Sequence, residues 1–231
     1  MPDLPSRIRI VELSALPMVA RFDVAAPLIG PVAVLPSAFN PPTRAHLHLL
    51  VSSAERLGAT QAALLTTRNV AKGVTGASHV QRMEMLLAAK AATPSLAVLA
   101  ANQARIIDQA ATLRQTFPMA TFAFVLGHDT LVRLFDRSYY SNMAAELASF
   151  FEHHTLLVTN RARHSIAEVE AFVAAQASEF ADRITPLEID GHHASLSSTS
   201  ARGHAAAGED APSLTPEVAG YVRTHGLYRD G

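Results

Sequence analysis

The chain has 231 residues, of which 49% are apolar and 17% charged, a balance typical of a globular protein and not of a disordered one. The formal net charge of −1 provides no long-range attraction to nucleic acids or membrane surfaces, so we expect neither as a partner. The chain lacks cysteine, which excludes disulfides and thiolate metal sites, and no apolar run reaches the roughly 18 residues of a membrane span. A cytoplasmic location is therefore our expectation.

The first 30 residues are ambiguous. The segment Arg7–Leu13 (RIRIVEL) alternates in polarity, so it could form an edge strand, or residues 1–30 could be a loosely held extension. Charged residues interrupt its apolar positions, so it does not resemble a signal peptide. We expect a single domain over residues 31–231.

Short β-rich runs then alternate with helical stretches. Residues 31–36 predict a buried strand, followed by a helix over about 45–57 that Gly58 closes. Residues 62–67 predict a second strand, and Ser78 can cap a helix that runs to about residue 92. Further strands are predicted over residues 95–100, 121–127, 154–160 and 183–189, and further helices over 104–115, 199–207 and 216–225.

This alternation predicts βαβ units. The expected fold is α/β, a Rossmann-like doubly wound and mostly parallel sheet with helices at the C-terminal end of the chain. Ligands of such sheets bind beyond the carboxyl ends of the strands, near the point where the strand order reverses. We therefore expect functional side chains just after Pro36, Thr67, Gly127 and Ile189.

The segment that follows the first predicted strand combines polar side chains with a helix start. Pro41 and Pro42 stiffen a turn, Thr43 lies near the start of the helix, and His46 follows on the same face. A hydroxyl and an imidazole beside the free N–H groups of a helix form an anion site. Alternatively, Thr43 is an ordinary helix cap and His46 a buried core histidine, and spacing alone does not decide between them.

A second polar segment precedes the helix predicted over residues 199–207. Ser198 or Thr199 can cap this helix, and Arg202 lies one turn further on. Two hydroxyls, free N–H groups and a guanidinium suit a phosphate group. The alternative is an ordinary capped helix with a solvated arginine.

Together, the two segments resemble the two signatures of the class I nucleotidylyltransferases. The first comprises Phe39-Asn40-Pro41 with Thr43 and His46, and the second comprises Ser197-Ser198-Thr199 with Arg202. The resemblance is closest to a divergent branch of the nicotinamide or nicotinate mononucleotide adenylyltransferases, and it extends from about residue 32 to residue 228. It is supported by Gly127 and Asp129 after a strand, by Lys72 before a helix with Arg82 and Met85, and by the C-terminal segment 214–228.

The resemblance implies an enzyme that transfers the adenylyl group of ATP to a pyridine mononucleotide and releases pyrophosphate. It implies that Mg²⁺ arrives on the ATP phosphates with water as its other ligands, so no protein metal site is expected. A homo-oligomer is one open possibility. The implied catalytic residues are His46, Thr43, Lys72 and Arg202; the nucleotide-binding residues are Ala38, Phe39, His46, Gly127, Asp129, Ser198, Thr199 and Arg202; the acceptor-binding residues are Asn40, Lys72, Asn102 and Tyr140.

Several positions depart from the family pattern. Pro36, Ser37 and Ala38 stand where the family usually has glycines, and the chain has no tryptophan to stack on a pyridine ring. Tyr140, with Tyr139 beside it, lies at about the right distance to substitute. Two alternatives therefore stay open: another phosphorylated acceptor, such as phosphopantetheine, and a relative that binds nucleotides without turnover.

The sequence gives less evidence for the roles of the other histidines. The neighbouring pairs His153–His154 and His192–His193 could suggest a metal site, but adjacent side chains point apart on a helix or strand. We interpret them as surface or substrate-loop residues. His128, which follows Gly127, could pack in the core or contact a substrate.

Overall fold

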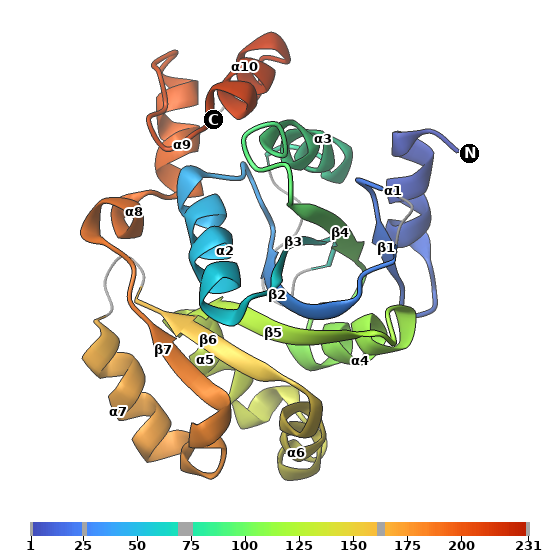
Figure 1. Ribbon diagram of the computed structural model, residues 1–231. Helices are drawn as coiled ribbons and strands as arrows, with labels where there is room; N and C mark the ends of the chain where they lie inside the picture. The colour runs from blue at the N-terminus through green and yellow to red at the C-terminus, as the bar shows by residue number, and fades with distance from the viewer. Residues whose placement is uncertain (1, 25–26, 69–75, 161–164, 230–231) are drawn as a thin grey trace.

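The structure is a computed structural model that describes residues 2–24, 27–68, 76–160 and 165–229. Its centre is a seven-stranded sheet in the order β1-β4-β3-β2-β5-β6-β7, in which β1 alone is antiparallel to its neighbour (Figure 1). Within the described ranges, every helix is too short or too polar to cross a membrane. The strands are β1 (Val19–Arg21), β2 (Gly30–Ser37), β3 (Thr60–Thr66), β4 (Ala97–Ala101), β5 (Ala120–Gly127), β6 (Thr155–Thr159) and β7 (Ile184–Leu187).

The order of the strands places a switch point at the middle of the sheet. The chain runs outward from β2 through β3 to β4, returns to pair β5 with the other side of β2, and continues outward through β6 to β7. The carboxyl ends of β2 and β5 are therefore neighbours at one edge. This topology confirms the predicted Rossmann-like doubly wound sheet, and the switch point is where such sheets bind ligands.

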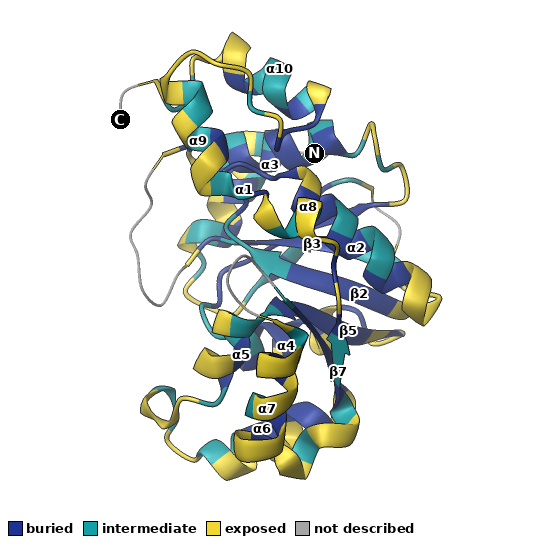
Figure 2. Cartoon of the chain, turned by 90° about the vertical axis from the view of Figure 1, so that its left-hand side faces the viewer, coloured by how far each residue is buried: buried dark blue, intermediate teal, exposed yellow. Residues whose placement is uncertain are grey.

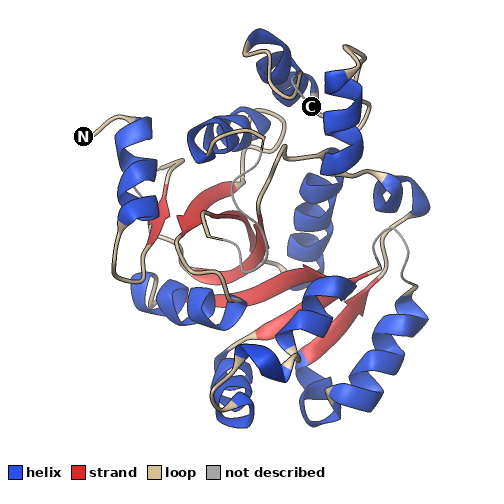
Figure 3. Ribbon diagram, turned by 180° about the vertical axis from the view of Figure 1, so that it is seen from behind, coloured by secondary structure: helices blue, strands red, loops and turns tan. Residues whose placement is uncertain are grey.

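Helices cover both faces of the sheet, and alternate strand residues enter the two apolar layers. In β2, Val32 and Val34 belong to one layer, while Ala33 and Leu35 belong to the other. Figure 1 shows the sheet between the two helical layers, Figure 2 shows the buried residues of the sheet, and Figure 3 shows the same layers from behind. One layer has α1 (Leu4–Leu13), α2 (Arg44–Leu57), α3 (His79–Ala89), α9 (Ser198–Ala206) and α10 (Pro216–Thr224); the other has α4 (Ile106–Thr116), α5 (His128–Leu134), α6 (Met143–His153) and α7 (Ile166–Gln176).

The segment Arg7–Leu13 is neither of the two alternatives left open by the sequence, an edge strand or a loosely held extension. Residues 4–13 form the helix α1, and the Asp3 side chain caps it by accepting the Ser6 N–H at 2.9 Å. Ile8 and Val11, three residues apart, are fully buried in the same layer as α3. The alternation of RIRIVEL is thus one face of a helix, and the edge strand is the later segment β1.

The remaining elements agree with the predictions to within a few residues, with three differences. The helix capped by Ser78 ends at Ala89, short of residue 92. Ser197, and neither of the two predicted residues, is the N-cap of α9, with its side chain accepting the Ser200 N–H at 3.0 Å. The sequence pattern gives no residue ranges for α5, α6, α7, the short helix α8 (Gly191–Ser195) or the 3₁₀ segments η1 (Arg137–Tyr139) and η2 (Ser178–Arg183).

Candidate active site

The turn after β2 carries the first signature to the switch point. Phe39 has a φ of 44°, in the left-handed region that side chains rarely adopt, and it is buried. Its ring packs on the His46 imidazole with 5.1 Å between the ring centroids. Thr43 then forms the N-cap of α2, so that the first N–H groups of this helix lie near the carboxyl end of β2.

His46 is buried at the start of α2, and its two ring nitrogens have different surroundings. The side chain is 2% exposed, and its Nδ1 accepts the Thr43 N–H at 3.1 Å and lies 2.7 Å from Thr43 Oγ1. Because Nδ1 accepts a backbone N–H, the neutral ring carries its proton on Nε2. Nε2 lies 3.4 Å from Ser37 Oγ, at the end of β2. One ring nitrogen therefore stabilises the helix start, while the other is a donor at the switch point.

The second signature is hydrogen-bonded to the first. Ser198 Oγ donates to the Pro41 carbonyl at 2.8 Å, and Arg202 Nη1 donates to the Asn40 carbonyl at 2.7 Å. Arg202 Nη2 also donates to Thr199 Oγ1 at 3.2 Å. Because Ser197 caps the helix, the Ser198 and Thr199 hydroxyls are available for these contacts. The structure thus brings together segments that are more than 150 residues apart.

Two further residues complete this arrangement. Arg82 is buried, and it donates to the carbonyl oxygens of Ala77, at 2.8 Å, and Ala38, at 3.4 Å. Tyr228 donates its hydroxyl to Asn40 Oδ1 at 2.9 Å. Neither was predicted as a site residue, although both lie in segments that carried the family resemblance. The polar groups of Asn40 therefore organise the turn, which gives this residue a structural role beside the predicted contact with the acceptor.

Burial and charge perturb these groups. Burial lowers the pKa of the Arg82 guanidinium, and the positive charge of Arg202 lowers it further, while Tyr228 opposes these effects. Burial also raises the pKa of the Tyr228 phenol. The guanidinium groups of Arg82 and Arg202 repel each other. Binding of an anion near them is favoured, because its negative charge offsets this repulsion.

The carboxyl end of β5 contributes the second part of the switch point. Gly127 is the N-cap of α5, and Asp129 is an exposed residue in the first turn of that helix. Asp129 therefore lies just after β5, the strand that neighbours β2, at the same edge of the sheet. The His128 ring packs edge-on against Phe172 with 5.9 Å between centroids, which supports the packing role for this histidine.

Asn102, predicted as an acceptor-binding residue, has both ends of its side-chain amide bonded to other parts of the chain. Its buried amide nitrogen donates to the carbonyl oxygens of Ser14, at 3.1 Å, and Leu16, at 2.9 Å, and its oxygen accepts the Met18 N–H at 2.8 Å. These bonds fasten the segment between α1 and β1 to the end of β4, so Asn102 has a structural role. Lys72 lies outside the described residues.

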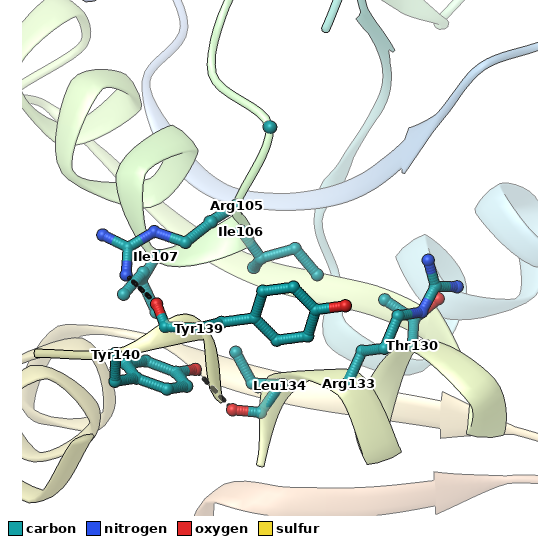
Figure 4. Close-up of a pocket in the computed structure, with 9 residues that line it drawn as sticks. Arg105, Ile106, Ile107, Thr130, Arg133, Leu134, Tyr139 and Tyr140 are labelled. Carbon is teal, nitrogen blue, oxygen red and sulfur yellow. Dashed lines mark hydrogen bonds between the residues drawn. The ribbon is translucent and has the colours of Figure 1, made fainter. Parts of the chain in front are cut away.

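The predicted aromatic residue Tyr140 borders a cavity between α4 and α5 (Figure 4). Its hydroxyl donates to the Leu134 carbonyl, burial raises its pKa to about 12, and the Arg105 guanidinium lies 5.7 Å from its ring centroid. Figure 4 shows the ring of Tyr139 extending across the cavity toward Thr130. Tyr140 is therefore held by its neighbours, and Tyr139 presents its ring to the cavity.

A family model and a curated relative match the chain. The model of the cytidylyltransferase-like family matches residues 34–202, a range that contains both signatures. A Schizosaccharomyces pombe protein, provisionally named a nicotinamide mononucleotide adenylyltransferase, is 30% identical over 135 residues, which are 57% of this chain and 53% of that protein. The chain therefore spans about half the length of this relative.

Solved structures share the fold. The Plasmodium falciparum nicotinic acid mononucleotide adenylyltransferase superposes with a TM-score of 0.66 in its complex with NaAD, at 16% identity, covering 87% of this chain and 98% of that one. A Vibrio parahaemolyticus protein, provisionally named a nicotinate-nucleotide adenylyltransferase, has a TM-score of 0.52 at 16% identity, covering 88% of this chain and 98% of that one. The family model covers most of the chain and both signatures, so the protein belongs to the cytidylyltransferase-like family.

Proposed function

We propose that the protein transfers the adenylyl group of ATP to nicotinamide or nicotinate mononucleotide and releases pyrophosphate. The observation that carries the proposal is the pair of hydrogen bonds, Ser198 to Pro41 and Arg202 to Asn40, that joins the two signatures beside His46. The names of the relatives support the pyridine mononucleotide as acceptor. They leave open whether its ring carries an amide or a carboxylate.

In this reaction, a phosphate oxygen of the mononucleotide attacks the α-phosphorus of ATP. The bond between that phosphorus and the oxygen bridging to the β-phosphate breaks, and pyrophosphate leaves with the electron pair. No protein nucleophile takes part, so the protein contributes orientation and neutralisation of the developing negative charge. His46 Nε2–H would donate to an α-phosphate oxygen, and the N-terminus of α2 would lie beside it.

The second signature suits the departing phosphates. The bonds from Arg202 to Asn40 and Thr199 use two of the five N–H donors of its guanidinium. The others can bind the β- and γ-phosphates, with Ser198 and Thr199 beside them. Asp129 would accept hydrogen bonds from a ribose. Lys72, outside the described residues, is proposed to neutralise phosphate charge on the attacking or leaving group.

The proposed reaction includes Mg²⁺ as a companion of ATP. The signature segments 39–46 and 197–202 contain hydroxyl, imidazole, amide and guanidinium groups but no carboxylate, so they suit phosphate oxygens better than a hard cation. We therefore propose that the triphosphate and water hold the ion. Its contribution is to neutralise phosphate charge.

The test is pyrophosphate release from ATP and Mg²⁺, with nicotinamide and nicotinate mononucleotide offered in parallel. The His46→Asn variant, purified in the same way, controls for contaminating activity. We expect pyrophosphate release with at least one mononucleotide and its loss in the His46→Asn variant. The rates with the two mononucleotides rank them as acceptors. If the protein binds ATP but releases no pyrophosphate with either, the pyridine assignment is wrong. Phosphopantetheine as acceptor and a non-catalytic role would then be the alternatives to test.

A further inference from the structure

A second polar cluster comprises His48, Asp190 and His193. His48 is on α2, two residues after His46, while Asp190 and His193 belong to the N-cap and body of α8. One ligand atom from each of the three residues lies within 4.8 Å of the other two. Figure 1 shows α8 beside α2. The cluster thus joins two elements that are distant in sequence.

The Asp190 carboxylate is oriented toward both imidazoles. Its Oδ1 accepts the His193 N–H at 3.0 Å, which is the ordinary cap of α8. Its Oδ2 lies 2.7 Å from His193 Nδ1 and 3.4 Å from His48 Nε2. The two rings are stacked, with 3.8 Å between centroids and 8° between planes. Helix capping explains the first oxygen, but it does not explain why two imidazoles converge on the second.

We propose that His48, Asp190 and His193 bind a divalent transition-metal ion of the zinc class. Two imidazole nitrogens and one carboxylate oxygen are a ligand set that such ions accept, whereas Mg²⁺ prefers oxygen ligands alone. Tetrahedral zinc with bonds of about 2.0–2.1 Å places its ligand atoms about 3.3 Å apart. The 2.7 Å separation of Asp190 Oδ2 from His193 Nδ1 must lengthen, and the stacked rings must turn so that both nitrogens face the ion. The three side chains are 32%, 52% and 27% exposed, which leaves them free to make this adjustment, and water can complete the coordination.

The site has a structural consequence. The bound ion cross-links α2 to α8, and α8 leads through Leu196 directly into Ser197, the cap of α9. It therefore fastens the segment that precedes the second signature to the helix that carries the first. The cross-link acts on the fold around residues 197–202 and does not depend on the proposed reaction.

The experiment is a titration of the full chain with zinc chloride alone, after chelator treatment and dialysis, followed by calorimetry. Co²⁺ provides a second probe through its visible absorption. We expect one ion per chain. His48→Gln, His193→Gln and Asp190→Asn should each weaken binding by at least about tenfold. Asparagine also caps helices, so Asp190→Asn should keep α8 folded.

His192→Gln is the matched control, because this exposed neighbour lies outside the cluster. It should bind zinc as the wild type does, and zinc should raise the Tm of the wild type and of this control but not that of Asp190→Asn. Two results would overturn the proposal. One is a wild-type chain that takes up no zinc, and the other is equal uptake by the control and the three cluster variants.

Discussion

Replacing His46 by Asn separates the two functions of its ring. The Asn Oδ1 lies near the position of Nδ1, so it can accept the Thr43 N–H, but no donor remains at the position of Nε2. The variant should therefore keep most of the free energy of unfolding. Its turnover should fall about a hundredfold or more, because one preorganised donor to the transition state is lost.

His46→Gln provides the reverse change. Its longer side chain can place an amide nitrogen near Nε2 but leaves the Thr43 N–H without the acceptor that Nδ1 supplied. Thr43 is 1% exposed, so water does not readily replace that acceptor. The free energy of unfolding should fall by about 1–3 kcal/mol, the cost of an unsatisfied buried donor. Turnover should fall less than in His46→Asn.

Urea unfolding and pyrophosphate release, measured on both variants and the wild type, test this separation. The Asn variant should be stable and slow, while the Gln variant should be less stable and faster than the Asn variant. Wild-type turnover in the Asn variant would refute the donor role of Nε2. Wild-type stability in the Gln variant would show that the bond between Nδ1 and the Thr43 N–H contributes little to the fold.

Three further changes test other parts of the structure. Arg202→Lys removes the planar fork that joins Asn40 to Thr199 but keeps one cationic donor, so kcat/KM for pyrophosphate release should fall about ten- to a hundredfold. An unchanged kcat/KM would contradict the role of Arg202. Asn102→Ala removes three hydrogen bonds to the N-terminal segment, so limited proteolysis should cut residues 14–18 faster while the KM for the mononucleotide stays the same. A raised KM with unchanged proteolysis would instead support the predicted contact between Asn102 and the acceptor. Burial lowers the pKa of His154 from 6.5 to about 4, so the unfolded state binds the extra proton between these values and stability should fall as the pH drops through this window. His154→Gln should flatten that part of the stability curve in urea unfolding, and an equal slope in both proteins would argue against this origin.

The central strands were predictable because parallel strands covered on both faces are continuous apolar runs. Residues 62–67 and 121–127 are of this kind, and the structure has β3 and β5 there. The approximate place of the site followed from the same pattern, since side chains just after such strands meet at one edge of the sheet. Thr43 and His46 lie at the start of α2, and Ser198 and Arg202 lie in α9. Helix-start patterns and the two signatures singled them out, and their binding roles stay predictions.

The errors arose where several interpretations share one local pattern. RIRIVEL alternates like a strand, yet Ile8 and Val11 also lie on one face of a helix, and packing against α3 favours the helix. Three consecutive hydroxyl residues can each cap α9, and the bond from Ser198 to Pro41 leaves Ser197 as the cap. The partners of Asn102 come from a segment without any motif, so no local signal indicated its structural role.

The contacts of Asn40 explain how the turn after β2 is held in place although Pro36, Ser37 and Ala38 stand where the family usually has glycines. Its carbonyl accepts from Arg202 and its Oδ1 accepts from Tyr228, and both donors lie beyond β7 in the sequence. Arg82 holds the Ala38 carbonyl from a third element, α3. The backbone of the turn is thus fixed by side chains from α3, α9 and the C-terminal segment, and flexibility at Ser37 and Ala38 is not needed for this. Arg202 also belongs to the second signature, so its hydrogen bond to Asn40 both fixes the turn and places a positive charge beside the turn.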